Sequence, residues 1–416
     1  MRTVKRLHPE NIFTATLIAY AIVPISGFST DIYLPSMPSM VSALHCSPHS
    51  IQITLPLFLI CYGLTQLFSG ILLDSYGRYR ISLLGLFIFS VSSLIIAITS
   101  QILVIYAMRM VQGICVGFIV VACRALFVDL YEGEKRKNYI SLMTIIWSVG
   151  PIVAPFVGGY LETLFGWRSS FYALSIYSIL LFIAQLIYCG ETLAYPIKLT
   201  VQSVLKNYRT ILSAKDFISG ILILGISYAL IMLFSLSSAF IIKNKFGYSA
   251  VMVGYASLIA GVAWMSGGLV GKALINRSFF AKIKNASIIQ AFLIILMIGT
   301  AFYFSNVWTF IFFAFVVHTT AGFIFNNFFT YCLSRFPQLA GLAGGLTGGL
   351  AYTLTAVLSY GIIALVKPES QLWLGVGYLI TSLLGIIVLW ISRGLYQAQA
   401  DAPEHPAEDK YLVAEM

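Results

Sequence analysis

The sequence predicts an all-α membrane protein in which a polar linker joins two bundles of six transmembrane helices. Three observations predict this fold. Of the 416 residues, 59% are hydrophobic and only 10% are charged, whereas soluble domains carry about 25% charged residues. The hydrophobic residues form twelve runs, each close to the length of about 20 residues that a helix needs to cross the hydrocarbon core. A polar, basic break separates the first six runs from the last six.

The twelve runs define the predicted spans and the domain organisation. The predicted spans are residues 13–37, 51–73, 81–99, 102–128, 139–161, 170–189, 216–242, 247–271, 284–304, 307–333, 340–365 and 370–392. The predicted domains are an N-terminal segment 1–12, a first bundle 13–192, a linker 193–215, a second bundle 216–392 and a tail 393–416. Two halves of six spans each are compatible with an internal repeat, in which parallel halves contain inverted triple repeats. The polar, proline-containing tail is typical of disorder.

The cations predict how the chain crosses the membrane. With the N-terminus in the cytoplasm, 19 of the 25 Lys and Arg residues fall on the inner side or its flanks. The positive-inside rule predicts this asymmetry, so both termini are expected in the cytoplasm. The net charge of +10 is spread through short loops, and no basic stripe with interleaved aromatic residues indicates a nucleic-acid partner. The first run lacks a clear cleavage site and is interpreted as a retained helix.

The six cysteines predict neither a disulfide framework nor a metal site. No Cys-x-x-Cys pair occurs, and only Cys46 falls in a predicted external loop. The six are therefore expected to be small packing residues. No cofactor and no metal is expected.

A charged turn between the second and third runs carries the most informative motif, G-x-x-x-D-x-x-G-R-x-R. Its residues are Gly70, Asp74, Gly77, Arg78 and Arg80. The two cations are placed to hold the aspartate and the carbonyl end of a neighbouring helix, and the glycines to let the backbone turn. This pattern resembles the signature of the major facilitator superfamily, where it implies a latch that breaks when the protein changes shape. The alternative is an ordinary turn with a positive-inside flank.

Three charged residues lie within the predicted spans of the first half: Asp31, Arg109 and Arg124. A charge at mid-bilayer costs about 2.5–3.5 kcal/mol on insertion scales, so each is a functional hypothesis. Counted from the outer helix ends, Asp31 is about 9 Å deep and Arg109 about 10 Å deep, so the two are placed to pair. Our hypothesis is that Asp31 carries a proton, because such a carboxyl group is neutral or charged according to its surroundings. The alternative is a permanent structural ion pair.

The fourth span contains two further resemblances. Arg109 opens R-M-V-Q-G, which resembles the family's helix-four motif and implies that the arginine biases the aspartate. Gln112 is a candidate ligand contact or an interhelical hydrogen bond. Arg124 and Asp129 lie in a segment similar to A-R-A-x-x-R-D of one subfamily, although Val128 replaces the second arginine. A gating contact and simple anchoring of Arg124 at the interface both remain open.

The fifth span contains closely spaced small residues and prolines: Gly150, Pro151, Ala154, Pro155, Gly158 and Gly159. Small residues let helices approach closely in lipid, and prolines bend them. The pattern resembles the antiporter motif of drug exporters. Together with the Asp31-x-Tyr-Leu-Pro ending of the first span, it is similar to the bicyclomycin/chloramphenicol-resistance (Bcr/CflA) branch of the drug:proton antiporters. An ordinary kinked helix is the alternative.

A central cavity is expected among spans 1, 4, 5, 7, 8, 10 and 11. Its candidate lining residues are Tyr33, Gln112, Trp147, Tyr228, Phe234, Trp264 and Phe325, with His318 as a further polar candidate. Aromatic walls bind large apolar bodies, and a ring face also attracts a cation. For His318, a hydrogen-bonded packing role is the alternative to a proton role. In the second half, the turn 267–277 has glycines and cations but no acid, so the inner latch is expected to be stronger in the first half.

The resemblance implies proton-coupled efflux of small amphipathic organic compounds by alternating access across a bacterial inner membrane. The expected partners are a small-molecule substrate, protons and the lipid bilayer, with the chain as a monomer. A proton-coupled transporter of one metabolite, or an exporter of a siderophore-like natural product, is the alternative. An enzyme or channel is not expected, because the spans lack clustered His, Asp or Glu and show no selectivity ring.

Overall fold

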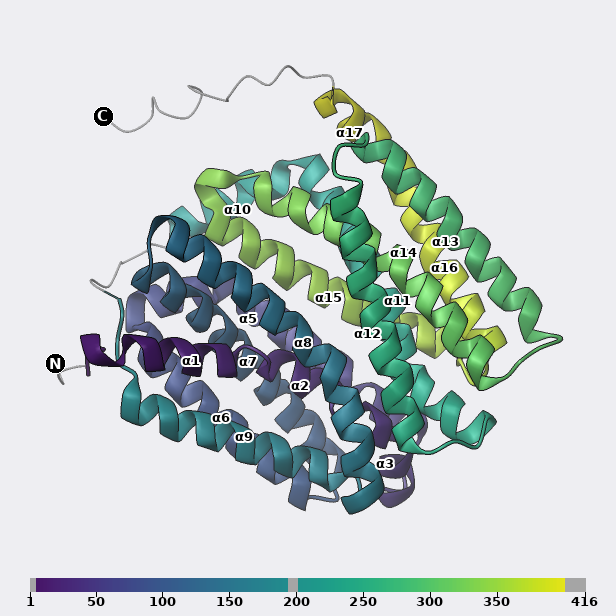
Figure 1. The fold of residues 1–416 in the computed structure, drawn as a ribbon, viewed down its shortest axis with the longest axis horizontal. Helices are drawn as coiled ribbons and strands as arrows, with labels where there is room; N and C mark the ends of the chain where they lie inside the picture. Colours follow the sequence, from purple (N-terminus) through teal and green to yellow (C-terminus); the bar gives the residue numbers. More distant parts are fainter. Residues whose placement is uncertain (1–4, 194–200, 401–416) are drawn as a thin grey trace.

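A computed structural model describes residues 5–193 and 201–400 as long helices arranged in two bundles (Figure 1). The first bundle contains α1 (Ile12–Ile22), α2 (Ile25–Asp31), α3 (Met37–Ala43), α4 (Pro48–Gln52), α5 (Thr54–Tyr76), α6 (Arg78–Ile98), α7 (Ile102–Leu130), α8 (Gly133–Phe165) and α9 (Arg168–Tyr188). The second contains α11 (Lys215–Phe240), α12 (Ala250–Ala273), α13 (Phe279–Ala301), α14 (Val307–Ser334), α15 (Ala340–Val366) and α16 (Gln371–Ile391). The shorter α10 (Val201–Ser213) and α17 (Arg393–Ala400) precede and follow the second bundle.

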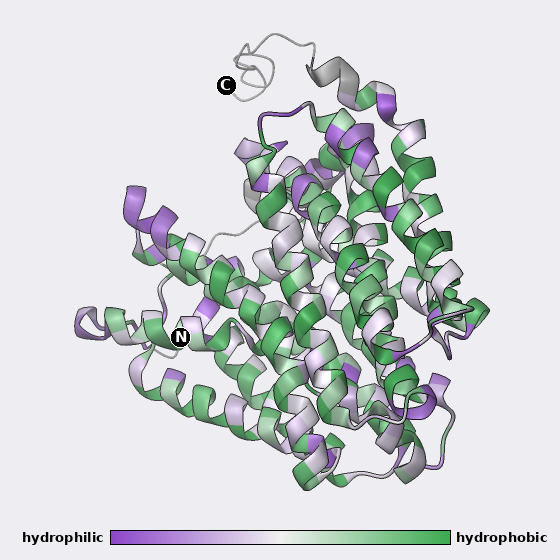
Figure 2. Ribbon diagram, turned by 45° about the vertical axis from the view of Figure 1, so that its right-hand side comes forward, coloured by the Kyte–Doolittle hydropathy of each residue, from purple (hydrophilic) through white to green (hydrophobic). Residues whose placement is uncertain are grey.

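Twelve helices in the described part of the chain are long and apolar enough to cross a membrane, which confirms the predicted fold class. Each predicted span coincides with one of these helices. Hydrophobic residues follow the lengths of the helices, and hydrophilic residues gather at their ends (Figure 2). The face that carries the α5–α6 and α7–α8 turns is called the inner face below, and the opposite face is called the outer face.

The first span is interrupted rather than continuous. It consists of α1, α2, a short 3₁₀ turn (Leu34–Ser36) and α3. Proline has no backbone N–H and clashes with the preceding turn, which explains why α2 starts directly after Pro24 and why Pro35 lies in the 3₁₀ turn. The interruption places Asp31 at the end of α2, in the interior of the span.

The glycines predicted in the fifth span lie where backbones approach closely. A Cβ atom at Gly158 would lie 1.7 Å from the Ile32 carbonyl oxygen, and one at Gly159 would lie 2.6 Å from the Ala250 carbonyl oxygen. Helix α8 therefore packs against the first span on one side and against α12 of the other bundle on the other. The helix continues through Pro151 and Pro155. Ala154 is fully buried, and Gly150 lies against Pro24.

A second glycine seam joins α5 to α15. A Cβ atom at Gly63 would lie 2.5 Å from the Gly349 carbonyl oxygen, and one at Gly348 would lie 2.8 Å from the side chain of Gln66. The two bundles thus meet along two helix pairs, α5 with α15 and α8 with α12. One helix of each bundle contributes to each pair (Figure 1).

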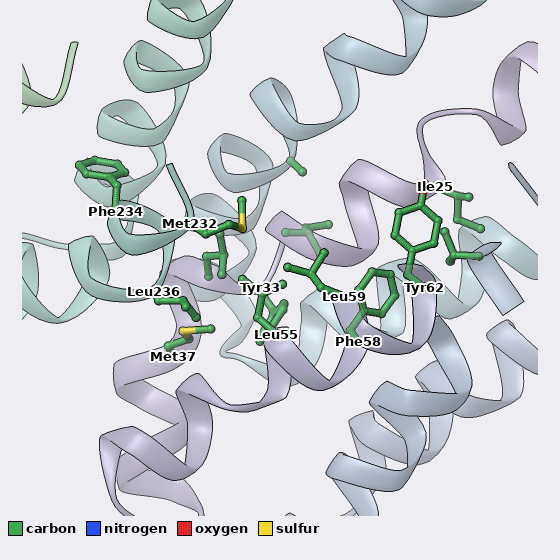
Figure 3. Packing of buried hydrophobic residues seen from close by; sticks show 14 of the residues in the cluster. Ile25, Tyr33, Met37, Leu55, Phe58, Leu59, Tyr62, Met232, Phe234 and Leu236 are labelled. Carbon is green, nitrogen blue, oxygen red and sulfur yellow. The ribbon is translucent and has the colours of Figure 1, made fainter. Parts of the chain in front are cut away.

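Between these seams, the hydrophobic core is shared by both bundles. Tyr33 and Leu55 of the first bundle and Phe234 and Leu236 of the second belong to the same buried cluster (Figure 3). All four side chains are 1% exposed or less. The halves are therefore in van der Waals contact on the side of the molecule that contains the end of the first span.

We predict that Gly158→Ala strongly destabilises the protein. The new methyl group overlaps the backbone carbonyl of Ile32, which cannot move aside as the end of a flexible side chain could. Overpacking of this kind costs about 1–3 kcal/mol or more. The measurement is the Tm of purified protein in detergent. Gly361→Ala in α15 is the matched control, because a Cβ atom there meets nothing within 4 Å. Equal Tm values for the two variants would contradict this packing.

Candidate functional site

A cavity lies between the two bundles, formed by α2, α5 and α8 from the first and by α11, α12, α14 and α15 from the second. Counted out to where it meets solvent, the space is about 970 Å³. Six of the sequence candidates line it: Asp31, Trp147, Tyr228, Phe234, Trp264 and Phe325. The remaining wall includes small polar side chains, such as Ser26 and Ser235.

Aromatic rings form one continuous wall of this cavity, with Tyr228 at its centre. The Tyr228 ring centroid lies 5.6 Å from the centroids of Trp264, Phe325 and Tyr352. Tyr352 in turn lies 4.9 Å from Tyr62. Rings in such tilted and edge-on arrangements attract one another beyond their burial, so the wall is a preformed surface for flat apolar groups.

Tyr62 and Tyr352 are cavity residues that the sequence analysis missed. Span 2, which carries Tyr62, was not expected to line the cavity, and span 11 was expected to line it but yielded no candidate residue. The available signal was a tyrosine hydroxyl within a predominantly apolar span, which needs a polar partner or water.

Asp31 is the only charged residue that lines the cavity in the described part of the chain. Its residue exposure is 5%, and its Oδ2 accepts a 2.6 Å hydrogen bond from the Thr30 hydroxyl. The interruption of the first span presents this carboxyl group at the end of a helix rather than in the middle of one. A molecule in the cavity therefore shares its space with Asp31.

Arg109 lies behind the cavity wall and is fully buried. Its Nη1 donates to the Ser29 carbonyl (2.9 Å) and to Gln112 Oε1 (2.8 Å). The guanidinium carbon lies 4.6 Å from the ring centroid of Tyr33 and 4.7 Å from that of Phe58. Its Nε and Nη2 have no hydrogen-bond partner within the residues that the structure describes.

The predicted pairing of Asp31 with Arg109 is not formed. Among the ion pairs of the described residues, none joins these two side chains. Arg109 is held by the Ser29 carbonyl and by two aromatic faces, while Asp31 lies on the cavity wall and binds Thr30. The result is a buried cation without a paired carboxylate, which is a costly arrangement.

Three other candidates are not cavity residues. Tyr33 is fully buried and shares a 2.9 Å hydrogen bond with Thr54. Gln112 Nε2 donates to Ser93 Oγ at 2.8 Å. This is the interhelical hydrogen bond that the sequence analysis gave as the alternative to a ligand contact. For Gln112 the reason is that α7 packs on α5 and α6, one layer behind the cavity.

His318 is the third of these candidates. It is fully buried, and its Nε2 shares a 3.0 Å hydrogen bond with the Tyr378 hydroxyl. Its ring packs edge-on against Phe234, with 5.2 Å between centroids. His318 therefore contacts the back of a residue that lines the cavity.

The inner latch of the first bundle is centred on Arg78. Its Nη2 lies 3.0 Å from Asp74 Oδ1, its Nη1 lies 3.1 Å from the Ala125 carbonyl, and it forms an ion pair with Asp129. The turn between α5 and α6 is thereby tied to the inner end of α7. Arg80 is exposed on the first turn of α6.

Two expectations about this region need correction or refinement. Gly70 does not serve a turn, because it lies within α5 and a Cβ atom there would meet nothing within 4 Å. Asp129 of α7 forms its ion pair with Arg78 of α6, and not with a cation of α7. Arg124 is exposed beside Gly344 of α15, and Val128 is also exposed.

Glu191, which the sequence analysis did not single out, caps the start of α6. Its carboxylate accepts hydrogen bonds from the backbone N–H groups of Arg78 (3.1 Å) and Tyr79 (3.2 Å), and from those of the two residues that follow it. Gly77 has φ +97°, and a Cβ atom there would lie 2.3 Å from Glu191 Oε2. The Thr192 hydroxyl donates to Asp129 Oδ2 at 2.7 Å. The end of the first bundle thus completes the latch.

The second bundle has an inner ion pair of its own. Arg335 Nε lies 2.6 Å from Asp216 Oδ2, and the Tyr331 hydroxyl donates to the same oxygen at 2.6 Å. The α12–α13 turn lacks an acidic residue, as expected. The acidic residue of the second bundle is Asp216 of α11, and it pairs with Arg335, the residue that follows α14. The expectation of a lopsided latch overlooked this acid because Asp216 is distant in sequence from the turn.

The outer ends of the bundles are joined by hydrogen bonds. Gln52 Nε2 donates to the Leu236 carbonyl (2.8 Å), and Lys243 Nζ to Ser39 Oγ (3.0 Å). The Tyr360 hydroxyl and His49 Nε2 lie 2.7 Å apart, and their rings stack. These bonds close the outer seam between the halves.

Comparison with known proteins identifies relatives of the chain. The model of the Major Facilitator Superfamily matches residues 19–360. Multidrug resistance protein D of Escherichia coli is 28% identical over 376 residues, which cover 90% of this chain and 93% of the relative. The bicyclomycin resistance protein homolog of Haemophilus influenzae is 26% identical over 370 residues, covering 86% and 90%. The crystal structure of a D-xylose–proton symporter shares the fold, with TM-score 0.75 and 13% identity over 91% of this chain and 97% of that one.

We predict that Glu191→Gln lowers the stability of the protein by about 0.5–2 kcal/mol, the range for loss of a helix N-cap. The amide keeps one acceptor oxygen but removes the negative charge and the second acceptor at the start of α6. The measurement is chemical or thermal unfolding in detergent. Glu134→Gln is the control, because Glu134 also lies in the first turn of a helix but bonds to the Lys137 side chain and, among the described residues, to no backbone N–H group. An equal shift in both variants would argue against the cap.

Proposed function

The chain belongs to the Major Facilitator Superfamily, and on this basis we propose that it exports small amphipathic organic compounds in exchange for protons. It is a multi-pass membrane transporter of small molecules rather than an enzyme. The names of its relatives, one a multidrug resistance protein and one a bicyclomycin resistance protein homolog, support a drug-like cargo. The proposed location is a bacterial inner membrane, with the inner face in the cytoplasm and the chain as a monomer.

The observation that carries the proposal is the position of Asp31 on the cavity wall with Arg109 behind it. Because Asp31 is the only charged residue lining the cavity in the described ranges, a proton bound there occupies the same chamber as the cargo. Ionised Asp31 has a nearby buried cation available as a partner, whereas protonated Asp31 leaves Arg109 uncompensated. Cargo that displaces the proton therefore changes the electrostatic balance of the first bundle.

The conformational step that we propose is alternating access. The outer seam is joined by hydrogen bonds between the halves, whereas the Arg78 and Arg335 clusters each lie within one half. Opening to the outside breaks the seam while each bundle moves largely as a unit. The glycine-lined contacts of α5 with α15 and of α8 with α12 provide smooth surfaces for this motion.

The cavity wall favours cargo with a flat apolar group. Its aromatic surface demands little specific shape, and its single acid does not require a positively charged ligand. Neutral and zwitterionic compounds fit this chemistry as well as cations do.

We predict that Asp31→Asn abolishes proton exchange by the transporter. In inverted vesicles with an acidified lumen and a pH-sensitive dye, a transported compound should release protons through the native protein. The amide cannot carry a proton, so the variant should lose this signal while still binding the compound. Glu134→Gln, which removes an exposed carboxylate, should behave as the native protein does. Undiminished proton release by the Asp31 variant would sink the proposed coupling.

We also predict that Trp264→Ala weakens binding of aromatic cargo roughly 2- to 13-fold, the equivalent of about 0.5–1.5 kcal/mol for an aromatic contact. Trp264 packs between Tyr228 and Phe325 on the cavity wall. The measurement is the Kd of a transported aromatic compound by fluorescence titration. Trp390→Ala removes an indole of the same size that is 46% exposed and is not among the residues that line the cavity. Equal losses in the two variants would place the cargo elsewhere.

A further inference from the structure

A groove opens on the second bundle at the inner ends of α12 and α13 and along α14. Counted out to solvent, it holds about 1170 Å³. Val270, Ile289 and Phe323 give it an apolar floor, while Arg277 and Lys282 lie at its inner end. None of these residues lines the central cavity.

Among the residues that the structure describes, neither cation of the groove has a carboxylate partner. No ion pair of the described chain includes either one. Lys282 Nζ has only a 3.4 Å contact with the Leu274 carbonyl and lies 5.8 Å from the Phe279 ring centroid. Residues 272–284 contain four Lys or Arg residues and no Asp or Glu. The head of the groove is thus a site of uncompensated positive charge.

The apolar part of the groove extends from this charged end into the membrane. Ile289 lies ten residues after the start of α13, which corresponds to about 15 Å along the helix. This is half of a hydrocarbon core of about 30 Å. Val270 is 45% exposed and Ile289 is 52% exposed, so both side chains are open to contact with an acyl chain. The dimensions match one leaflet.

We propose that this groove binds an anionic phospholipid of the cytoplasmic leaflet. The lipid phosphate contacts Arg277 and Lys282, and one acyl chain lies along Val270, Ile289 and Phe323. Arginine and lysine are the usual phosphate ligands, and basic pockets between transmembrane helices on the cytoplasmic side suit anionic headgroups. A zwitterionic lipid brings its own ammonium group, which competes with the two cations for the phosphate.

The bound lipid contacts two helices that also build the central cavity. On α12, Val270 follows the cavity residue Trp264 by six positions, and on α14, Phe323 precedes Phe325 by two. Lipid in the groove therefore stabilises the packing of α12 against α13 and α14 directly behind the aromatic wall. The site itself does not depend on which cargo the cavity carries.

The test is native mass spectrometry of the purified protein in detergent, with phosphatidylglycerol and phosphatidylcholine added in equal amounts. The native protein should retain phosphatidylglycerol preferentially. Arg277→Gln with Lys282→Gln should lower its affinity roughly 30-fold, as expected for two basic residues at an anionic surface. Lys135→Gln with Arg209→Gln makes the same charge change on exposed inner-face residues outside the groove and should leave retention unchanged.

A second variant separates the groove from charge alone. Ala281→Trp places a large ring in the groove without changing any charge, and it should also lower phosphatidylglycerol retention. Equal retention of the two lipids, or unchanged retention in the Arg277/Lys282 variant, would overturn the proposal. Displacement of the lipid by excess inorganic phosphate would instead identify a small-anion site and would also overturn it.

Discussion

The constraint on which this structure depends is a guanidinium group buried in the first bundle without a paired carboxylate. Within the described residues, Arg109 is hydrogen-bonded through one nitrogen only, to the Ser29 carbonyl and Gln112, and its faces are covered by Tyr33 and Phe58. Leaving a buried charge without its ionic partner costs about 3–5 kcal/mol. The aromatic faces and the Ser29 carbonyl offset part of that cost. Ser29 belongs to the same span as Asp31, so any motion of Asp31 toward or away from Arg109 changes the energy of the bundle.

That arrangement requires backbones to approach one another more closely than ordinary side chains allow. The interrupted first span is held against α8 where Gly158 meets the Ile32 carbonyl, one residue after Asp31. A helix without glycine at this position would move the carboxyl group relative to both the cavity and Arg109. The small-residue motif of the fifth span therefore acts on the site by fixing the position of the first span, as well as by forming a seam with α12 through Gly159.

The sequence predicted the spans well and the site only partly, for a physical reason. Span length and hydrophobicity are local properties, so twelve helices and their approximate ends follow from composition along the chain. The direction in which a side chain points depends on how each helix is rotated against its neighbours, and an apolar helix in lipid carries little pattern to indicate that rotation. Gln112 was therefore expected in the cavity but faces α6, while Tyr62 was missed although it lines the wall. Glu191 was missed because its four N–H partners are defined only by the folded turn.

The distribution of polar contacts determines which polar interactions the proposed motion breaks. The ion pairs of Arg78 and Arg335 lie within single bundles, so a relative movement of the bundles leaves both intact. The outer seam contains a few hydrogen bonds, including those of Gln52, Lys243 and Tyr360, in addition to the hydrophobic core that the two bundles share. Each contributes about 0.5–1.5 kcal/mol net, so breaking three costs a few kcal/mol. Because cargo or a proton shifts a two-state equilibrium only by its differential affinity for the states, a change of charge at Asp31 has to act against these hydrogen bonds and against the hydrophobic contacts that opening the outer side separates.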